Sequence, residues 1–109
     1  MCGRYVIMSK SSIYKKYRIV INKNFNISPG NKVPVLDQNL EPKMLEWNFS
    51  PIWSSKPLNL INARIETLNI KPSFKNSLRC IFIADGYYEW KKENKRKIPY
   101  YHTFKTGLI

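Results

Sequence analysis

The segment RCIFIADGYYEWKK, residues 79–92, carries the strongest strand signal in the chain. It is rich in β-branched and aromatic residues, which favour strands, and Gly86 stands in its middle as an expected kink or bulge. ENKR, residues 93–96, predicts a hairpin turn, and KIPYYHTF, residues 97–104, predicts the returning strand. The basis of the fold is therefore expected to be an antiparallel sheet.

The rest of the chain predicts further short strands and little helix. Strand patterns occur in GRYVIM (3–8), RIVIN (18–22), VPVL (33–36), KMLEWNF (43–49) and the first half of LNLINARIETLNI (58–70). A short helix is expected through SIYKKY (12–17), capped by Ser11 or Ser12, and another could begin in ARIETL (63–68) before Pro72 stops it. Turns are expected at Pro29-Gly30 and at residues 37–39, and SPIWSSKP (50–57) is expected to be a loop.

These elements predict an α+β fold, mainly an antiparallel, barrel-like mixed sheet with a few short helices. The 109 residues suffice for one small domain, 1–109, and are too few for two. KTG at 105–107 predicts another hairpin turn, followed by the start of a strand at Leu108-Ile109. A sheet that stops within a hairpin leaves an unpaired edge. We therefore expect a domain that is incomplete at its C-terminus, a fragment, or one part of a larger assembly.

The charge balance predicts a polyanionic partner. Lysine and arginine together number 19 against 7 acidic residues, which gives a formal net charge of +12. Nucleic acid is the first candidate partner, and an anionic membrane surface is the second. The alternative is that lysine is abundant in the source proteome and is merely solvated, because many of the lysines are scattered.

Several classes of protein are not indicated by the sequence. No apolar run is long enough to span a bilayer and no signal peptide is visible, so we expect a cytosolic protein, or a nuclear one in a host with a nucleus. Cys2, Cys80 and His102 do not form a recognisable zinc motif. For this reason no metal is expected. P-loop and dinucleotide-binding glycine patterns are missing, so no nucleotide cofactor is expected either.

Cys2 is the principal candidate for chemistry. If Met1 is removed, Cys2 carries both a free α-amine, with an ordinary pKa of about 7.7 to 8.0, and a thiol. The amine can form an imine with an aldehyde, and the thiol can then add to the imine carbon to close a thiazolidine ring. The alternative is that Met1 stays in place, or that Cys2 is a small buried residue, as free cysteines often are.

Strand geometry adds polar neighbours on three separate segments. In extended chain Cys2 and Arg4 share one face, and so do Asn62 and Arg64. Asp85, Tyr87 and Glu89 line another face, with Tyr88 and Trp90 opposite. Glu89, between aromatic residues, is expected to have a raised pKa and could move protons. The alternatives are a surface carboxylate facing a lysine for Glu89, a turn residue for Asn62 and a surface ion pair for Arg64.

Five stretches together resemble one known family. They are MCGRY (1–5), NISPGNKVPVL (26–36), WNFSPIW (47–53), INAR (61–64) and CIFIADGYYEWKK (80–92). In this order they resemble the SOS response-associated peptidase (SRAP) family, which includes proteins that crosslink covalently to abasic sites in single-stranded DNA. The resemblance spans nearly the whole chain.

The resemblance implies a role for each candidate residue. Cys2 would be the nucleophile, Asn62 would position the α-amine or the sugar, and Glu89 would handle protons. The DNA-binding residues would be Arg4 and Arg64, on flanking phosphates, and Trp53, stacked on a base. The family often has two adjacent tryptophans at this point, whereas this chain has Trp53-Ser54.

The resemblance also implies what this chain lacks. The family carries a histidine in its second half that assists sugar ring opening, and His102 does not match it; we expect His102 to be a strand residue near aromatics. Cys80 is expected to be a core residue. Three functions stay open: capture of abasic sites, a truncated DNA-binding remnant without catalysis, and a cysteine-type peptidase limited to removing its own first residue. No Cys-His pair of the hydrolytic type can be assembled, which weighs against general proteolysis.

Intact mass spectrometry tests the starting condition of the thiazolidine chemistry. We expect the purified protein to have lost Met1, so that its mass corresponds to a chain beginning at Cys2. Complete retention of Met1 would exclude the aminothiol reaction for that preparation, because the α-amine would then belong to a different residue.

Overall fold

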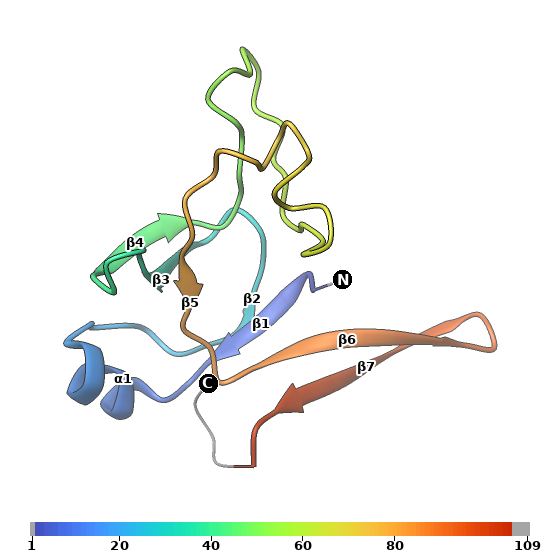
Figure 1. Cartoon of the computed structure of the whole chain (residues 1–109). Helices are drawn as coiled ribbons and strands as arrows, with labels where there is room; N and C mark the ends of the chain where they lie inside the picture. Colours follow the sequence, from blue (N-terminus) through green and yellow to red (C-terminus); the bar gives the residue numbers. More distant parts are fainter. Residues whose placement is uncertain (1, 106–109) are drawn as a thin grey trace.

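The computed structural model describes residues 2–105, which form two antiparallel sheets and one short helix (Figure 1). The first sheet has the strand order β2-β1-β6-β7, and the second has the order β4-β3-β5. The elements are β1 (Arg4–Ile7), α1 (Lys10–Tyr17), β2 (Asn24–Ile27), β3 (Lys32–Leu36), β4 (Pro42–Glu46), β5 (Ile81–Phe82), β6 (Gly86–Glu93) and β7 (Arg96–Thr103). The expected α+β fold with mainly antiparallel strands is confirmed.

The hydrophobic core is built mainly from β1, β3 and the chain just before β6. Apolar side chains from these segments and from the stretch after α1 are buried together, among them Ile7, Ile13, Val35, Trp47 and Ile83. Burying such side chains stabilises the fold by about 1.5–3 kcal/mol each. Because β1 belongs to one sheet and β3 to the other, this core holds both sheets together.

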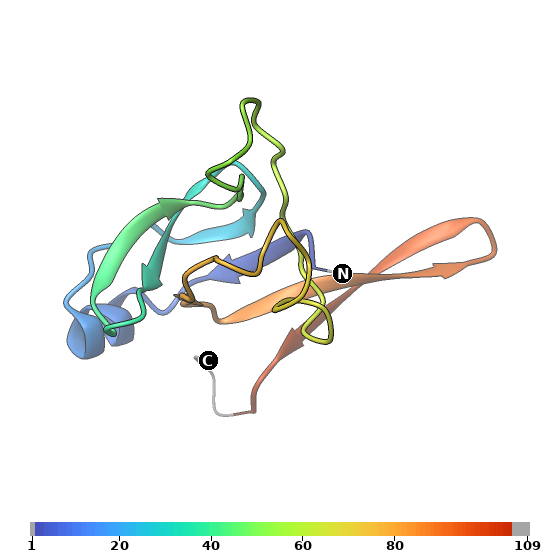
Figure 2. The ribbon, with the colours of Figure 1, turned by 45° about the horizontal axis from the view of Figure 1, so that its top comes forward.

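The β6–β7 hairpin confirms the strongest sequence prediction. Its two-residue turn, Asn94-Lys95, has φ values of 45° and 65°, the left-handed conformation that the tightest hairpin turns require. The pairing runs from Glu93 opposite Arg96 to Gly86 opposite Thr103. Figure 2 shows that the hairpin extends well beyond the rest of the fold, and every residue of β7 is exposed.

The segment 79–92 is not one strand, as the sequence suggested, but two that belong to different sheets. β5 pairs with β3, and β6 pairs with β1 and β7. Residues 83–85 connect them, and Asp85 there is buried. Gly86 begins β6 and is required by close packing: a Cβ atom would lie 2.6 Å from the His102 carbonyl oxygen.

Asp85 fastens the end of β1 to the start of α1. Its carboxylate accepts hydrogen bonds from the Met8 amide at 2.5 Å, from the Ser9 amide at 3.0 Å and from the Ser9 hydroxyl. Its own amide donates to the Val6 carbonyl oxygen at 2.8 Å, and the Thr103 hydroxyl donates to its carbonyl oxygen at 2.7 Å. One residue thus connects β1, α1, β6 and β7.

Two expected elements do not form. Residues 18–22 are not a strand: Arg18 ends α1 in the left-handed conformation with φ 59°, and Ile19 and Ile21 then enter the core from an irregular chain. No helix forms over residues 63–68, and residues 65–70 form turns instead. Ile65 and Ile70 are 84% and 73% exposed there, so a helix of this length would lack the packing that stabilises short helices.

Three smaller expectations also change. The strand predicted in the first half of 58–70 is reduced to a single bridge between Leu60 and Phe49. Cys80 is exposed and not part of the core, because it precedes β5 in a segment that runs along the surface. The predicted turn at 105–107 and strand at 108–109 lie, apart from residue 105, outside the described residues.

Replacing Asp85 should destabilise the fold strongly. Asp85→Ala leaves the Met8 and Ser9 amides without their acceptor, and we expect it to lower the free energy of unfolding by about 3 kcal/mol. Urea unfolding followed by circular dichroism measures the loss. The matched control is Glu66→Gln, an exposed position where a change under about 0.5 kcal/mol is expected. Equal stability of both variants would contradict the assigned role of Asp85.

Candidate functional site

Cys2 lies at a junction of the N-terminal segment, the INAR loop and β6. Its side chain is half-buried and packs against the core, and its thiol donates to the Arg4 carbonyl oxygen with an S–O distance of 3.5 Å. The Asn62 side-chain amide donates to the Cys2 carbonyl oxygen at 3.1 Å. The structure therefore brings together two of the predicted catalytic residues from positions sixty residues apart.

The third predicted catalytic residue, Glu89, acts on Cys2 through its charge. Arg4 pairs with Tyr88 across the β1–β6 ladder, which places β6 beside the N-terminal segment at this level. Burial raises the pKa of the Cys2 thiol above its ordinary value, and the negative charge of the Glu89 carboxylate raises it further, while the Arg4 main chain lowers it in part. The thiol is therefore held mainly in its protonated form near neutral pH.

The two arginines differ in their surroundings. Arg4 is half-buried, and its guanidinium donates to the Gly3 carbonyl oxygen at 2.7 Å, so it is folded back along the N-terminal segment. Arg64 is exposed and follows Asn62 by two residues in the same loop. Residues 61–64 are not a strand, so the expected shared face of Asn62 and Arg64 does not arise from a β ladder.

Trp53 stands apart from this site. Its ring is 62% exposed, and its indole N–H donates to the Pro72 carbonyl oxygen at 3.4 Å. In Figure 1 the loop between β4 and β5 that carries residues 50–57 extends away from β1 and β6.

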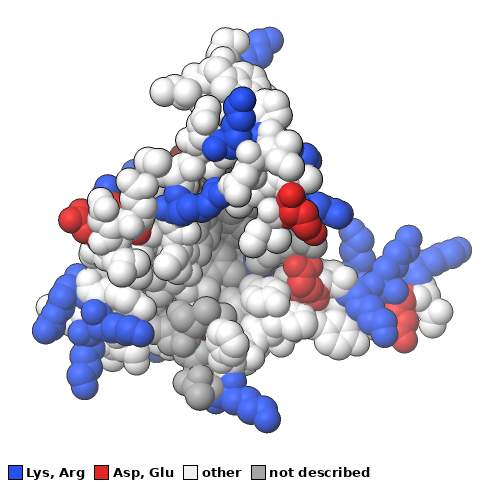
Figure 3. All heavy atoms as spheres, viewed as in Figure 1, with Lys and Arg blue, Asp and Glu red and all other residues white. Residues whose placement is uncertain are grey.

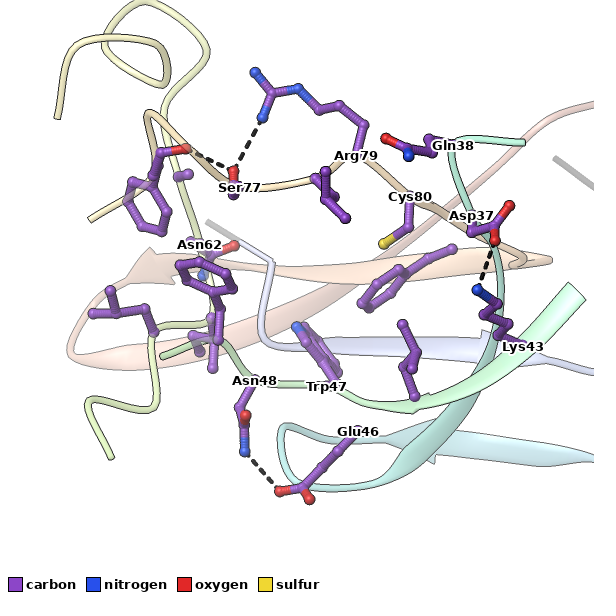
Figure 4. A pocket seen from close by; sticks show the side chains of 18 of the residues that line it. Asp37, Gln38, Lys43, Glu46, Trp47, Asn48, Asn62, Ser77, Arg79 and Cys80 are labelled. Carbon is purple, nitrogen blue, oxygen red and sulfur yellow. Dashed lines mark hydrogen bonds and ion pairs between the residues drawn. The ribbon is translucent and has the colours of Figure 1, made fainter. Parts of the chain in front are cut away.

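A cavity of about 510 Å³ opens beside Asn62 (Figure 4). Its wall is mostly apolar and includes Trp47, and Arg79 and Cys80 line it from the segment before β5. Asp37 and Lys43 form an ion pair at 2.8 Å at one end. Lys43 holds the pKa of the Asp37 carboxyl below its ordinary value, chiefly by this hydrogen bond.

Positive charge gathers on the β6–β7 hairpin. Figure 3 shows a dense group of basic side chains toward the tip of this hairpin, and the sequence there supplies Lys91, Lys92, Lys95, Arg96 and Lys97. Glu89 lies on the same hairpin, farther from its tip and nearer to the start of β6. The basic surface thus begins next to the candidate site and leads away from it.

The described residues contain no group of three or more His, Cys, Asp or Glu side chains suited to hold a metal ion. His102 stacks on Tyr87 with ring centroids 5.0 Å apart, as a strand residue among aromatics. Within 2–105, no helix is long and apolar enough to cross a membrane.

Two residues near the site have roles that the sequence analysis did not find. Asp85 was grouped with Tyr87 and Glu89, but it is buried and bound to Met8 and Ser9. Tyr5 lies deep in the core, 3% exposed, with its hydroxyl unpaired among the described residues. The sequence did carry a signal for the burial of Tyr5, because this residue follows the Cys-Gly-Arg motif directly and is followed by apolar strand residues.

The fold and the site define a small antiparallel β protein with a cysteine at position 2 held beside an amide and a carboxylate. A family model described as "SOS response associated peptidase (SRAP)" matches residues 1–109. The chain belongs to this family, as its motifs predicted.

Individual relatives agree with this assignment. The abasic site processing protein YedK of Escherichia coli is 41% identical over 71% of this chain and 37% of its own length. YoaM of Bacillus subtilis, also named an abasic site processing protein, is 32% identical over 100% of this chain and 56% of its own. The chain spans about half the length of the curated relatives it matches, or less.

Solved structures agree with the fold. A protein from Bacteroides thetaiotaomicron has a TM-score of 0.70 at 26% identity and covers 91% of this chain, which in turn covers 47% of that structure. A phage-related protein from Bordetella bronchiseptica gives a TM-score of 0.69 at 28% identity, covering 92% of this chain and 54% of its own.

Replacing Glu89 should make the Cys2 thiol more acidic. Glu89→Gln removes a negative charge that disfavours the thiolate, so we expect the pKa of the Cys2 thiol to fall. The rate of iodoacetamide alkylation at Cys2, followed by mass spectrometry from pH 6 to 10, measures it. Glu93→Gln, four residues along the same strand, is the matched control and should leave the midpoint unchanged. A higher midpoint in Glu89→Gln would contradict the assigned electrostatic effect.

Proposed function

We propose that this domain captures abasic sites in single-stranded DNA covalently, through a thiazolidine formed by Cys2 after Met1 is removed. The observation that carries the proposal is the hydrogen bond of Asn62 to the Cys2 main chain beside the charge of Glu89. It fixes the one residue that can supply an amine and a thiol together. The names of the matched relatives, abasic site processing proteins, support the substrate class.

The proposed chemistry has two stages. The ring-opened sugar of an abasic site presents an aldehyde at C1, and the neutral α-amine of Cys2 attacks this carbon. Loss of water gives an imine, and the Cys2 sulfur then adds to the imine carbon while the nitrogen takes up a proton. The five-membered ring that results is more stable than the imine alone.

Asn62 and Glu89 serve these stages differently. Asn62 would hold the main chain of Cys2, so that the α-amine and the thiol face the same carbon. Glu89 would first donate a proton to the hydroxyl that leaves as water and regain one as the imine forms. It would then accept the thiol proton and pass it to the ring nitrogen, because a nearby carboxylate can serve as both acid and base. The raised pKa of the Cys2 thiol makes such a base useful at neutral pH.

Basic and aromatic side chains would hold the DNA. Arg4 and Arg64 would contact phosphates next to the lesion, since the guanidinium fork matches phosphate oxygens. Trp53, exposed on its loop, would stack on a base, a contact worth about 1–3 kcal/mol. The lysines of the β6–β7 hairpin would attract the strand without reading its sequence. The proposed setting is DNA damage in the cytosol or, in a eukaryotic host, the nucleus.

A second candidate is a DNA-binding domain without catalysis. It is favoured by the length of the chain, about half that of its curated relatives or less. Under this alternative the basic surface binds single strands, while crosslinking requires further residues from a second half or a partner chain. A peptidase activity limited to the removal of Met1 fits either candidate.

A crosslinking experiment separates the two candidates. The purified protein is incubated with single-stranded DNA that carries one abasic site, and a shifted band is sought on a denaturing gel after heating. We expect the band with the wild type and with Cys80→Ser, the matched thiol control, and complete loss with Cys2→Ser. Binding at low salt with no band from any variant would instead establish the non-catalytic alternative.

A further inference from the structure

The two faces of the exposed β6–β7 hairpin differ in chemistry. Successive residues of a strand project to opposite faces, and residues directly opposite each other in an antiparallel ladder project to the same face. One face, called the aromatic face below, therefore carries Tyr88, Trp90 and Lys92 from β6 and Lys97, Pro99 and Tyr101 from β7. The other face carries both acidic residues of the two strands, Glu89 and Glu93.

Contacts between the rings agree with this division. The centroid of the Tyr88 ring lies 5.4 Å from that of Tyr101, its partner across the ladder, and 6.2 Å from that of Trp90, two residues along β6. Trp90 and Tyr101 are each 43% exposed. The aromatic face thus presents a continuous group of rings that still offers flat surface to a ligand.

Positive charge flanks this group of rings at both ends. Lys92 and Lys97 stand directly opposite each other toward the hairpin tip, and both are exposed. Like charges at directly opposite positions destabilise a β ladder, so an anion bound between them would offset their repulsion. At the other end, Arg4 of β1 stands opposite Tyr88 and so belongs to the same face.

Rings in a row between cations match the chemistry of a single-stranded nucleic acid. Its bases have flat surfaces that stack on aromatic side chains whatever their sequence, and its phosphates attract lysine. We propose that the aromatic face is a stacking platform for the bases of a single DNA strand, whose phosphates lie on Lys92 and Lys97. Glu89 and Glu93 make the opposite face less favourable for such a strand, because they repel phosphate.

The platform extends the proposed DNA contact beyond the lesion. Arg4, at its inner end, is two residues from Cys2, whereas the two lysines lie toward the tip of the hairpin, which extends away from the fold (Figure 2). A strand with its lesion at Cys2 would continue along the hairpin with undamaged bases on Trp90. The choice of single-stranded DNA rests on the proposed function, but binding of undamaged bases does not require the chemistry of Cys2.

Binding of an undamaged oligonucleotide tests the platform. A fluorescein-labelled single strand of thymines, which contains no aldehyde, is titrated with the full chain at low salt, and fluorescence anisotropy gives the dissociation constant. We expect Trp90→Leu, which keeps an apolar side chain without the flat ring, to raise this constant about tenfold, as for the loss of one base–aromatic stack. Tyr100→Leu is the matched control and should leave the constant unchanged, because Tyr100 is 46% exposed but projects to the opposite face.

The salt dependence of binding separates stacking from charge. Trp90→Leu should lose affinity by the same factor at every salt concentration, because a stacked ring releases no counterion. Lys92→Gln should instead reduce the slope of log affinity against log salt by about 0.7, the value for one phosphate contact on a single strand. The same substitution removes the like-charge pair with Lys97, so its midpoint of urea unfolding should rise. Weaker binding by a more stable variant is not a consequence of misfolding.

A second ring variant keeps the test independent of one substitution. Tyr101→Leu, on β7, should weaken binding in the same way as Trp90→Leu, and circular dichroism checks that both are folded. Binding as tight as wild type by both folded variants would overturn the platform, and so would an equal loss in Tyr100→Leu. Binding of the wild type to vesicles of anionic phospholipid but not to the oligonucleotide would overturn it in favour of a membrane surface.

The two proposals fail separately. If the wild type forms no crosslink with abasic DNA but Trp90→Leu selectively weakens binding of the undamaged strand, the proposed capture is wrong and the platform stands. If crosslinks form and Trp90→Leu and Tyr101→Leu bind the oligonucleotide as tightly as wild type, the capture stands and the platform is wrong.

Discussion

The fold depends most on the buried carboxylate of Asp85. Its oxygens accept hydrogen bonds from the end of β1 and the start of α1, while its own main chain joins the start of β6 to Val6 and Thr103. The register of β1 against β6 is fixed at this point. That register places Arg4 opposite Tyr88, and so it determines which part of β6, next to Glu89, the N-terminal segment lies beside.

The reactive end of the chain is held by a contact of a different kind. Asn62 reaches the Cys2 main chain from an irregular loop, and the loop itself is braced by short-range turns such as the Thr67 amide on the Arg64 carbonyl at 3.2 Å. A loop can carry such a residue because the sheet beneath it is rigid. Cys2 is thus fixed from two directions, by the sheet through Arg4 and by the loop through Asn62.

Several strand and loop surfaces of the domain are exposed. β7 is exposed throughout, and the apolar side chains of Leu78, which lines the cavity, and of Ile81 are more than half exposed. Exposed apolar surface of this extent often marks a site of contact with another molecule. The hydrogen bond from Asn62 to Cys2 and the effect of the Glu89 charge on the Cys2 thiol both arise within residues 2–105.

The sequence by itself determined the β6–β7 hairpin, the mainly antiparallel fold, the family and the choice of Cys2, because local periodicity, turn residues and short motifs carry that information. It was wrong for residues 18–22, where β-branched residues predict a strand but the left-handed conformation of Arg18 turns the chain away from the sheet. It was also wrong for residues 63–68, where helix-favouring residues lack a surface to pack against in the fold. Only the tertiary structure decided that Asn62 meets Cys2, that Cys80 is exposed, and that Asp85 and Tyr5 are buried. Such pairings join residues far apart in the chain, and no local pattern specifies them.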